Sequence, residues 1–185
     1  DGRYVLPDAT LGPNGAEIIF QSGNARGDDF STAGSLNDWQ DQIGRLCLGN
    51  SRLLFAVSCA FAAPLLRLAG MDGGGFHLKG ESTDGKTTAM KVAASVGGGP
   101  DYWQTWRATG NAIEAIASRR NDALLCLDEL KEIDPKAAGS TAYMLSNGQG
   151  KARARVDGDL RERKQWRLLF FSTGELSLAE HAEQA

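Results

Sequence analysis

The sequence has few of the residues that disulfide-rich, zinc-binding or membrane-spanning proteins need. Only three cysteines and two histidines occur among its 185 residues. The cysteines are widely spaced and form no C-x-x-C pair, which excludes a disulfide framework or a structural zinc site. We therefore expect reduced, mostly buried thiols and a cytoplasmic protein. The longest apolar stretch, residues 53–66, contains Pro64 and is too short to cross a bilayer, so we expect a buried, kinked helix there.

A large excess of one charge is also absent. The chain has 20 basic and 23 acidic residues, a formal net charge of −3, and 42% apolar residues. This composition excludes a wholly disordered or uniformly polybasic protein. The charge is uneven, however, because residues 151–167 hold seven basic side chains against three acidic ones. The chain is therefore mildly acidic overall but contains one basic segment.

The order of sequence patterns predicts an α/β core. We expect residues 1–70 to form loops and helices, with Ser35 and Ser51 as helix caps. From residue 71 to 185, short apolar runs alternate with helical stretches. Strands are expected near residues 76–78, 102–107 and 123–127, and helices near residues 86–96, 111–120 and 135–147. Such alternation is typical of a parallel sheet with helices on both faces.

The strongest motif is a glycine-rich loop of the form G-x-x-x-x-G-K-[ST]. It reads Gly80-Glu81-Ser82-Thr83-Asp84-Gly85-Lys86-Thr87-Thr88, between an expected strand and an expected helix. The glycines allow turns that direct backbone N–H groups at phosphate oxygens, and the helix adds its positive end. Lys86 then reaches the β- and γ-phosphates and the Thr87 hydroxyl binds Mg²⁺. This pattern predicts a nucleotide-binding P-loop.

A second motif places two carboxylates after a buried strand. Asp128 and Glu129 follow the apolar residues 123–127, at the end of a parallel strand where ligands bind in open α/β sheets. We expect Asp128 to hold Mg²⁺ and Glu129 to orient and deprotonate a water, as phosphoryl transfer requires. The second carboxylate favours a hydrolysing ATPase over a small-molecule kinase. No N-K-x-D guanine motif is present, so ATP is the expected nucleotide.

Three further polar residues are possible nucleotide sensors. Ser172 and Thr173 end an apolar strand that would reach the site if it lay beside residues 123–127. Asn147 either closes the preceding helix or contributes a polar group to the site.

The basic segment has the pattern of a β-hairpin. Two alternating runs flank the turn signal Asp157-Gly158-Asp159. The hairpin would project Lys151, Arg153, Arg155, Arg161 and Arg163 from the catalytic edge of the sheet. Three interpretations stay open: contact with the backbone of a nucleic acid, an arginine finger formed by Arg153 or Arg155, or a charged edge that prevents aggregation.

These residues together resemble the domain of unknown function 927 family of bacteria and phages. The resemblance extends over residues 39–175 and rests on separate blocks in one order: residues 61–66, 80–88, 93–96, 106–109, 121–122, 127–130, 147–151 and 172–175. Two features depart from the family pattern. Gly97 follows Val96 where a tryptophan is expected, and the chain ends at Ala185 where a RecA/AAA-like core needs one more strand. The chain is therefore expected to be cut short.

The resemblance implies a helicase-like ATPase attached to primase-like regions of mobile elements. It also implies that the hairpin before the sensor strand is similar to the DNA-gripping hairpin of superfamily 3 helicases, which act as rings. The expected protein is an Mg²⁺-dependent ATPase acting on single-stranded or duplex DNA, as a homo-oligomer and without a membrane. A small-molecule kinase, a non-hydrolysing nucleotide switch or scaffold, and an ATPase with a protein partner are the alternatives.

Overall fold

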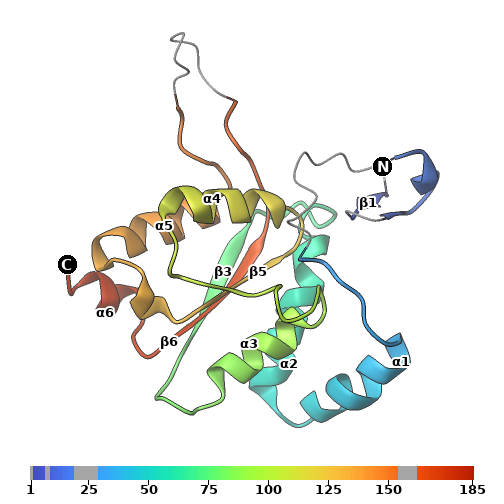
Figure 1. Ribbon diagram of the computed structural model, residues 1–185, viewed down its shortest axis with the longest axis horizontal. Coiled ribbons are helices and arrows are strands. Elements are labelled where there is room, and N and C mark those ends of the chain that lie inside the picture. Colours follow the sequence, from blue (N-terminus) through green and yellow to red (C-terminus); the bar gives the residue numbers. More distant parts are fainter. Residues whose placement is uncertain (1, 7–8, 19–28, 154–161) are drawn as a thin grey trace.

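The computed structural model describes residues 2–6, 9–18, 29–153 and 162–185. Figure 1 shows a central sheet with helices on both sides and an N-terminal extension. The strands are β1 (Tyr4–Val5), β2 (Thr10–Leu11), β3 (Gly74–Lys79), β4 (Gln104–Thr105), β5 (Leu124–Asp128) and β6 (Leu169–Gly174). The α-helices are α1 (Leu36–Trp39), α2 (Ser51–Ala62), α3 (Lys86–Ala94), α4 (Gly110–Arg119), α5 (Pro135–Asn147) and α6 (Leu178–Ala182). Single helical turns of other types cover Gly15–Glu17, Gln40–Gly44, Arg45–Cys47, Ala63–Leu65 and Leu130–Glu132.

Four strands form one parallel sheet in the order β3-β6-β5-β4. β6 lies between β3, the strand before the glycine-rich loop, and β5, the strand that leads to Asp128 and Glu129. The strand of Ser172 and Thr173 thus lies beside residues 123–127, as it must if either residue is to reach the site. Its register pairs Leu78 with Thr173 and Lys79 with Gly174. All three strands therefore end at the same edge, which we call the carboxyl edge. β1 and β2 form a separate antiparallel pair.

Each face of the sheet is covered by its own hydrophobic core. On one face, α2 and α3 pack in a cluster that includes Met90, Cys126 and Phe171. On the other face, α4 and α5 pack in a cluster that includes Leu125 and Phe170. Neighbouring residues of β5 and β6 thus pack into cores on opposite faces of the sheet, because successive side chains of a strand point to opposite faces. The predicted α/β class with helices on both faces is confirmed.

Local signals fixed most helix ends. Ser35 and Asp38 form a reciprocal capping box at α1, and Thr109 caps α4. Gly148, with a φ of 68°, ends α5 in the left-handed conformation. The expectation that Ser51 caps α2 is wrong: the side chain of Asn50 accepts the bond from the Leu53 amide, at 3.2 Å, and Ser51 is the first helical residue.

The helix over residues 53–66 is only half-buried, which corrects the sequence prediction. Ala56, Cys59 and Ala60 face the core, whereas Phe55 and Phe61 stay about half exposed. Pro64 changes the last turn to a 3₁₀ helix, because its ring cannot continue the α-helical bonding pattern. Within the described residues, no helix is long and apolar enough to cross a membrane.

The two flanks of the basic segment pair antiparallel, as a hairpin requires. Gln149 lies opposite Gln165 in an isolated bridge, and the Gly150 amide donates to the Lys164 carbonyl at 2.9 Å. Residues 154–161, with Arg155 and Arg161, lie outside the described residues.

This hairpin base is at the amino ends of the strands, not at the carboxyl edge (Figure 1). The reason is that α5 runs back along the sheet from Pro135, next to the end of β5, to Asn147, and the flank from Gln165 leads directly into the start of β6. The expectation that the basic side chains project from the catalytic edge is therefore wrong for Lys151, Arg153 and Arg163, the ones that the structure describes.

A buried ion pair holds the hairpin base to α4. The Glu114 side chain is 2% exposed and accepts two bonds from the Arg153 guanidinium, at 3.0 and 2.7 Å. Asn111 accepts a third, at 2.8 Å. Gly150 makes this approach possible, since a Cβ there would lie 2.5 Å from Glu114 Oε1. Arg153 is thus occupied by a structural contact.

We expect Arg153→Ala to destabilise the fold. The substitution leaves the buried Glu114 carboxylate without its charged partner, which costs about 3–5 kcal/mol for a buried pair. Urea unfolding should show the loss, whereas Arg163→Ala, at an exposed position, should stay within about 0.5 kcal/mol of wild type. Adding Glu114→Gln to Arg153→Ala should restore part of the stability. Equal midpoints for wild type and Arg153→Ala would show that the pair contributes nothing.

Candidate active site at the carboxyl edge of the sheet

The glycine-rich loop leaves the end of β3 and leads into α3. Its turn depends on two left-handed residues, Thr83 with a φ of 73° and Gly85 with a φ of 76°. The Asp84 carboxylate closes the loop by accepting from the Glu81 amide at 2.9 Å. The Gly80 amide donates to the Gly174 carbonyl of β6 at 3.2 Å, so the loop is anchored to the sheet at its start. This strand–loop–helix context is the one that the motif requires.

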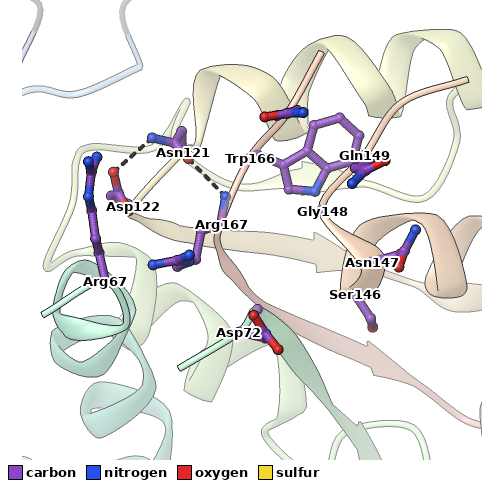
Figure 2. Close-up of a pocket in the computed structure, with 12 residues that line it drawn as sticks. Arg67, Asp72, Asn121, Asp122, Ser146, Asn147, Gly148, Gln149, Trp166 and Arg167 are labelled. Atoms are coloured by element: carbon purple, nitrogen blue, oxygen red, sulfur yellow. Dashed lines mark hydrogen bonds between the residues drawn. The ribbon is translucent and has the colours of Figure 1, made fainter. Parts of the chain in front are cut away.

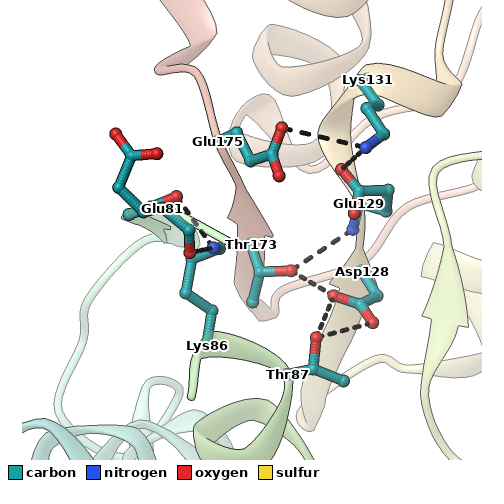
Figure 3. Close-up of polar contacts among 9 residues, drawn as sticks. Glu81, Lys86, Thr87, Asp128, Glu129, Lys131, Thr173 and Glu175 are labelled. Carbon is teal, nitrogen blue, oxygen red and sulfur yellow. Dashed lines mark hydrogen bonds and ion pairs between the residues drawn. The ribbon is translucent and has the colours of Figure 1, made fainter. Parts of the chain in front are cut away.

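Lys86 lies at the first position of α3 and folds over the loop. Its Nζ donates to the Gly80 carbonyl at 2.8 Å and to the Glu81 carbonyl, as Figure 3 shows. Two other residues of the motif, Ser82 in the loop and Thr88 in α3, are exposed. The ammonium group is thus held over the loop, next to the positive end of α3, where an anion is favoured.

Three side chains from three elements meet at Asp128. The Thr87 hydroxyl lies 3.3 and 3.2 Å from the two carboxylate oxygens of Asp128. The Thr173 hydroxyl donates to Asp128 Oδ1. Figure 3 shows these contacts as one chain from α3 through β5 to β6. The structure therefore brings together the predicted metal ligands and one of the two predicted strand sensors.

Glu129 follows Asp128 in a strained backbone conformation, with a φ of 59° and a ψ of 75°. Its amide donates to Thr173 Oγ1 at 3.3 Å. Its Oε1 atom is buried and accepts no hydrogen bond from any described residue, although Lys131 Nζ lies 3.6 Å away. Lys131 also lies 3.9 Å from Glu175 Oε2. Lys131 carries no signal in the sequence that marks it for this site, because only the turn after β5 brings it back over Glu129.

Ser172 does not reach this site. It is fully buried and accepts from Trp106 Nε1 at 2.8 Å, while its hydroxyl lies 3.0 Å from His77 Nδ1. His77 Nε2 lies 2.8 Å from the Leu176 carbonyl, an acceptor, so Nε2 carries the proton and Nδ1 accepts from Ser172. Burial lowers the pKa of His77, which favours this neutral form. This chain of bonds gives His77 a structural role within the sheet and leaves Thr173 as the strand residue at the site.

Asn147 also lies away from this site. It ends α5 at the opposite edge of the sheet, beside the hairpin base, and the helix is closed by Gly148 instead. Among the hairpin residues that the structure describes, Lys151 and Arg163 are exposed there, and Arg153 is paired with Glu114.

The residues present fit a magnesium ion bound together with a nucleotide. Within the described residues, no group of three or more His, Cys, Asp or Glu side chains forms a protein-only metal site. Thr87 and Asp128 instead present convergent oxygen atoms at the start of α3. This donor set suits Mg²⁺, which keeps several waters and completes its shell with substrate phosphates.

The fold is shared with a solved helicase. The structure "SCCmec type IV Cch - active helicase" matches with a TM-score of 0.72 and 24% identity, over 96% of this chain. The chain spans 34% of the length of that helicase. The ADP complex of NtrX from Brucella abortus has a TM-score of only 0.37 at 14% identity, over 80% of this chain and 35% of that one, too distant for an argument. No curated protein sequence matches the chain.

The likeness to the helicase supports a P-loop NTPase-like core at the level of the fold. The family is shown by the sequence itself. The model described as "Domain of unknown function (DUF927)" matches residues 1–165, which is most of the 185 residues. The chain therefore belongs to the DUF927 family.

Proposed function

We propose that this chain is the ATP-binding and ATP-hydrolysing domain of a helicase- or translocase-like protein that acts on DNA. The observation that carries the proposal is the convergence of Thr87, Asp128, Thr173 and Glu129 beside the Lys86 loop. These groups come from three separate segments: the start of α3, the end of β5 and the end of β6. A surface turn that matched the loop motif by chance would have no reason to face two carboxylates.

Each residue has a role set by its chemistry. The loop amides and Lys86 bind the phosphates of ATP, and Lys86 exchanges its bonds to the Gly80 and Glu81 carbonyls for phosphate oxygens. Thr87 and Asp128 would hold Mg²⁺, which neutralises charge on the phosphate oxygens when it is bound. Thr173 orients the Asp128 carboxylate by donating to it.

Glu129 is the residue we assign to the attacking water. Its buried Oε1 accepts no hydrogen bond from the described residues, so the carboxylate keeps an unused acceptor atom for the proton of the attacking water. General-base catalysis requires such an acceptor within hydrogen-bond reach of the proton. Lys131 keeps the carboxylate near the site through a weak contact at 3.6 Å.

The proposed action on DNA is supported by the likeness of the fold to a solved helicase and by the basic residues at the hairpin base. Lys151 and Arg163 are exposed at the hairpin base, available to phosphates. Arg153 is a poor candidate for DNA contact or for an arginine finger in a ring of subunits, because Glu114 and Asn111 occupy its guanidinium. Arg155 and Arg161 stay candidates for both roles.

Release of phosphate from ATP tests the proposal. We expect turnover that stops when EDTA removes Mg²⁺ and rises when single-stranded DNA is added. Binding of ATP should persist at reduced affinity without the metal, because the loop amides and Lys86 still contact the phosphates. Failure to bind ATP would refute the P-loop assignment. Binding without turnover at every protein concentration would instead identify a nucleotide switch.

A further inference from the structure

A polar hollow lies at the amino ends of the strands, at the base of the hairpin. Its volume is about 640 Å³. It is formed where the chain enters β3, β5 and β6 and where α5 ends, so it lies across the length of the sheet from the P-loop (Figures 1 and 2). Its main polar side chains are those of Arg67, Asp72, Asp122, Asn147, Gln149 and Arg167.

The backbone around this hollow is fixed by hydrogen bonds. The Asp122 amide donates to the Arg167 carbonyl at 2.6 Å, and the Arg167 amide donates to Asn121 Oδ1 at 2.8 Å. On the other side, the Trp166 amide donates to the Gly148 carbonyl at 2.9 Å. The side chains that line the hollow therefore project from a rigid frame, as binding residues need.

Four of these side chains are uncommitted, whereas the Asp122 carboxylate accepts a hydrogen bond from Asn121 Nδ2 at 2.8 Å. No hydrogen bond or ion pair joins the Arg67 or Arg167 guanidinium, or the amide groups of Asn147 and Gln149, to another residue in the described part of the chain. Figure 2 shows the two arginines toward the Asp122 side and the two amides toward the opposite side. The hollow thus has a cationic side and an amide side.

This arrangement matches the chemistry of one unit of a single-stranded nucleic acid. Arginine binds phosphate through paired N–H groups, and side-chain amides hydrogen-bond to the edges of unpaired bases. The Asp72 carboxylate can accept from the amino group of a base. The two arginines are balanced by two aspartates, so a phosphodiester with one negative charge suits the hollow better than a free nucleoside triphosphate.

A neighbouring hollow indicates that the ligand is a polymer. It is about 470 Å³ in volume, shares Gln165 with the first one and adds Arg163, Lys164 and the acidic Glu162, two cationic side chains against one anionic. Cationic groups therefore continue from the hollow along the outer flank of the hairpin. A chain of phosphates can follow such a path, because each phosphate contact adds affinity without reading the sequence.

We infer that the hollow between Arg67, Arg167, Asn147 and Gln149 is a binding site for a single-stranded nucleic acid, with a phosphate on the arginines and a base on the amides. The inference rests on the proposed action on nucleic acid, and not on ATP hydrolysis. It places the nucleic acid at the edge of the sheet opposite the nucleotide, with β6 running between the two sites.

Fluorescence anisotropy with a labelled oligothymidylate of about 20 nucleotides, longer than most single-strand sites, tests this inference. We expect Arg67→Gln/Arg167→Gln to weaken binding at least about tenfold and to flatten the slope of log K against log salt by about 0.7, the contribution of the one phosphate that the two arginines contact on a single strand. An oligouridylate of equal length distinguishes DNA from RNA as the preferred strand.

Two controls keep the outcome interpretable. Arg52→Gln removes an exposed charge at the far end of α2 and should leave affinity and slope unchanged. Phosphate release in the absence of oligonucleotide should be unchanged in the double variant, which separates failure of this inference from failure of the ATPase proposal.

If the double variant unfolds, Gln149→Glu, at an exposed position, should weaken binding by repelling phosphate. No binding by wild type, or equal slopes for wild type and variants, would overturn the inference.

Discussion

Replacing Lys86 by alanine is expected to reduce ATP turnover at least about 100-fold, the usual effect of removing a donor aimed at charge that develops in the transition state. Lys86 is the only cation held over the loop among the described residues, and its Nζ bonds there only to the Gly80 and Glu81 carbonyls. Its removal takes away the charge that binds the β- and γ-phosphates. We also expect weaker binding of ATP, which a fluorescent nucleotide analogue would measure.

The matched control lies one and a half turns further along α3. Lys91 is exposed and its Nζ lies 5.2 Å from the centre of the Trp103 ring, away from the loop. Lys91→Ala should therefore leave turnover close to wild type. Thermal unfolding should show that Lys86→Ala is folded, because Lys86 is only partly buried and lies outside both hydrophobic cores. Full turnover by Lys86→Ala would mean that phosphate binding does not take place at this loop.

Glu129→Gln is expected to lower turnover by about 10²–10⁴-fold, the range for loss of a general base, while ATP binding is retained. Glutamine has nearly the same shape as glutamate but cannot take the proton of the attacking water. The phosphate-binding groups, Lys86 and the loop amides, are untouched. The separation of binding from turnover is what distinguishes this variant from Lys86→Ala.

The same variant discriminates between the proposed ATPase and a kinase. A small-molecule kinase does not activate water, so Glu129→Gln would leave phosphate transfer to an added acceptor largely intact. Glu132→Gln is the control, since Glu132 is exposed on the following turn and makes no contact with Asp128 or Thr173. Turnover of Glu129→Gln equal to that of wild type would remove Glu129 from the mechanism.

The sequence predicted the carboxyl edge well because the relevant signals are local. A glycine pattern, a lysine and a threonine within nine residues specify the loop, and an apolar run before Asp128 specifies a buried strand end. Parallel strands then bring such ends to one edge whatever their order. Thr87 and Asp128, 41 residues apart in the sequence, therefore meet as expected.

The choice between Ser172 and Thr173 was not available from the sequence. Both residues lie on β6, and adjacent strand positions face opposite sides of the sheet. Which one meets Asp128 depends on the register against β3 and β5. Trp106, which reaches Ser172 from a distant loop, decides that Ser172 belongs to the core.

The hairpin shows the same division. The sequence predicted its turn and its charges, and the antiparallel pairing of the two flanks confirms a hairpin at the base. Its position relative to the P-loop depends on the direction of α5, and the role of Arg153 depends on Glu114, a carboxylate buried in an otherwise apolar helix face. Nothing in the local sequence marks that glutamate as buried.

The sequence by itself thus determined the α/β class, the glycine-rich loop between a strand and a helix, and the meeting of Thr87 with Asp128 at the carboxyl edge, because short-range patterns and the geometry of parallel strands are sufficient for these. Only the tertiary structure decided which residue of β6 meets Asp128, that Arg153 is held by Glu114, and that the base of the basic hairpin and the polar hollow lie at the opposite edge. Those features depend on strand register, helix direction and contacts between residues far apart in the chain. Long-range packing fixes all three.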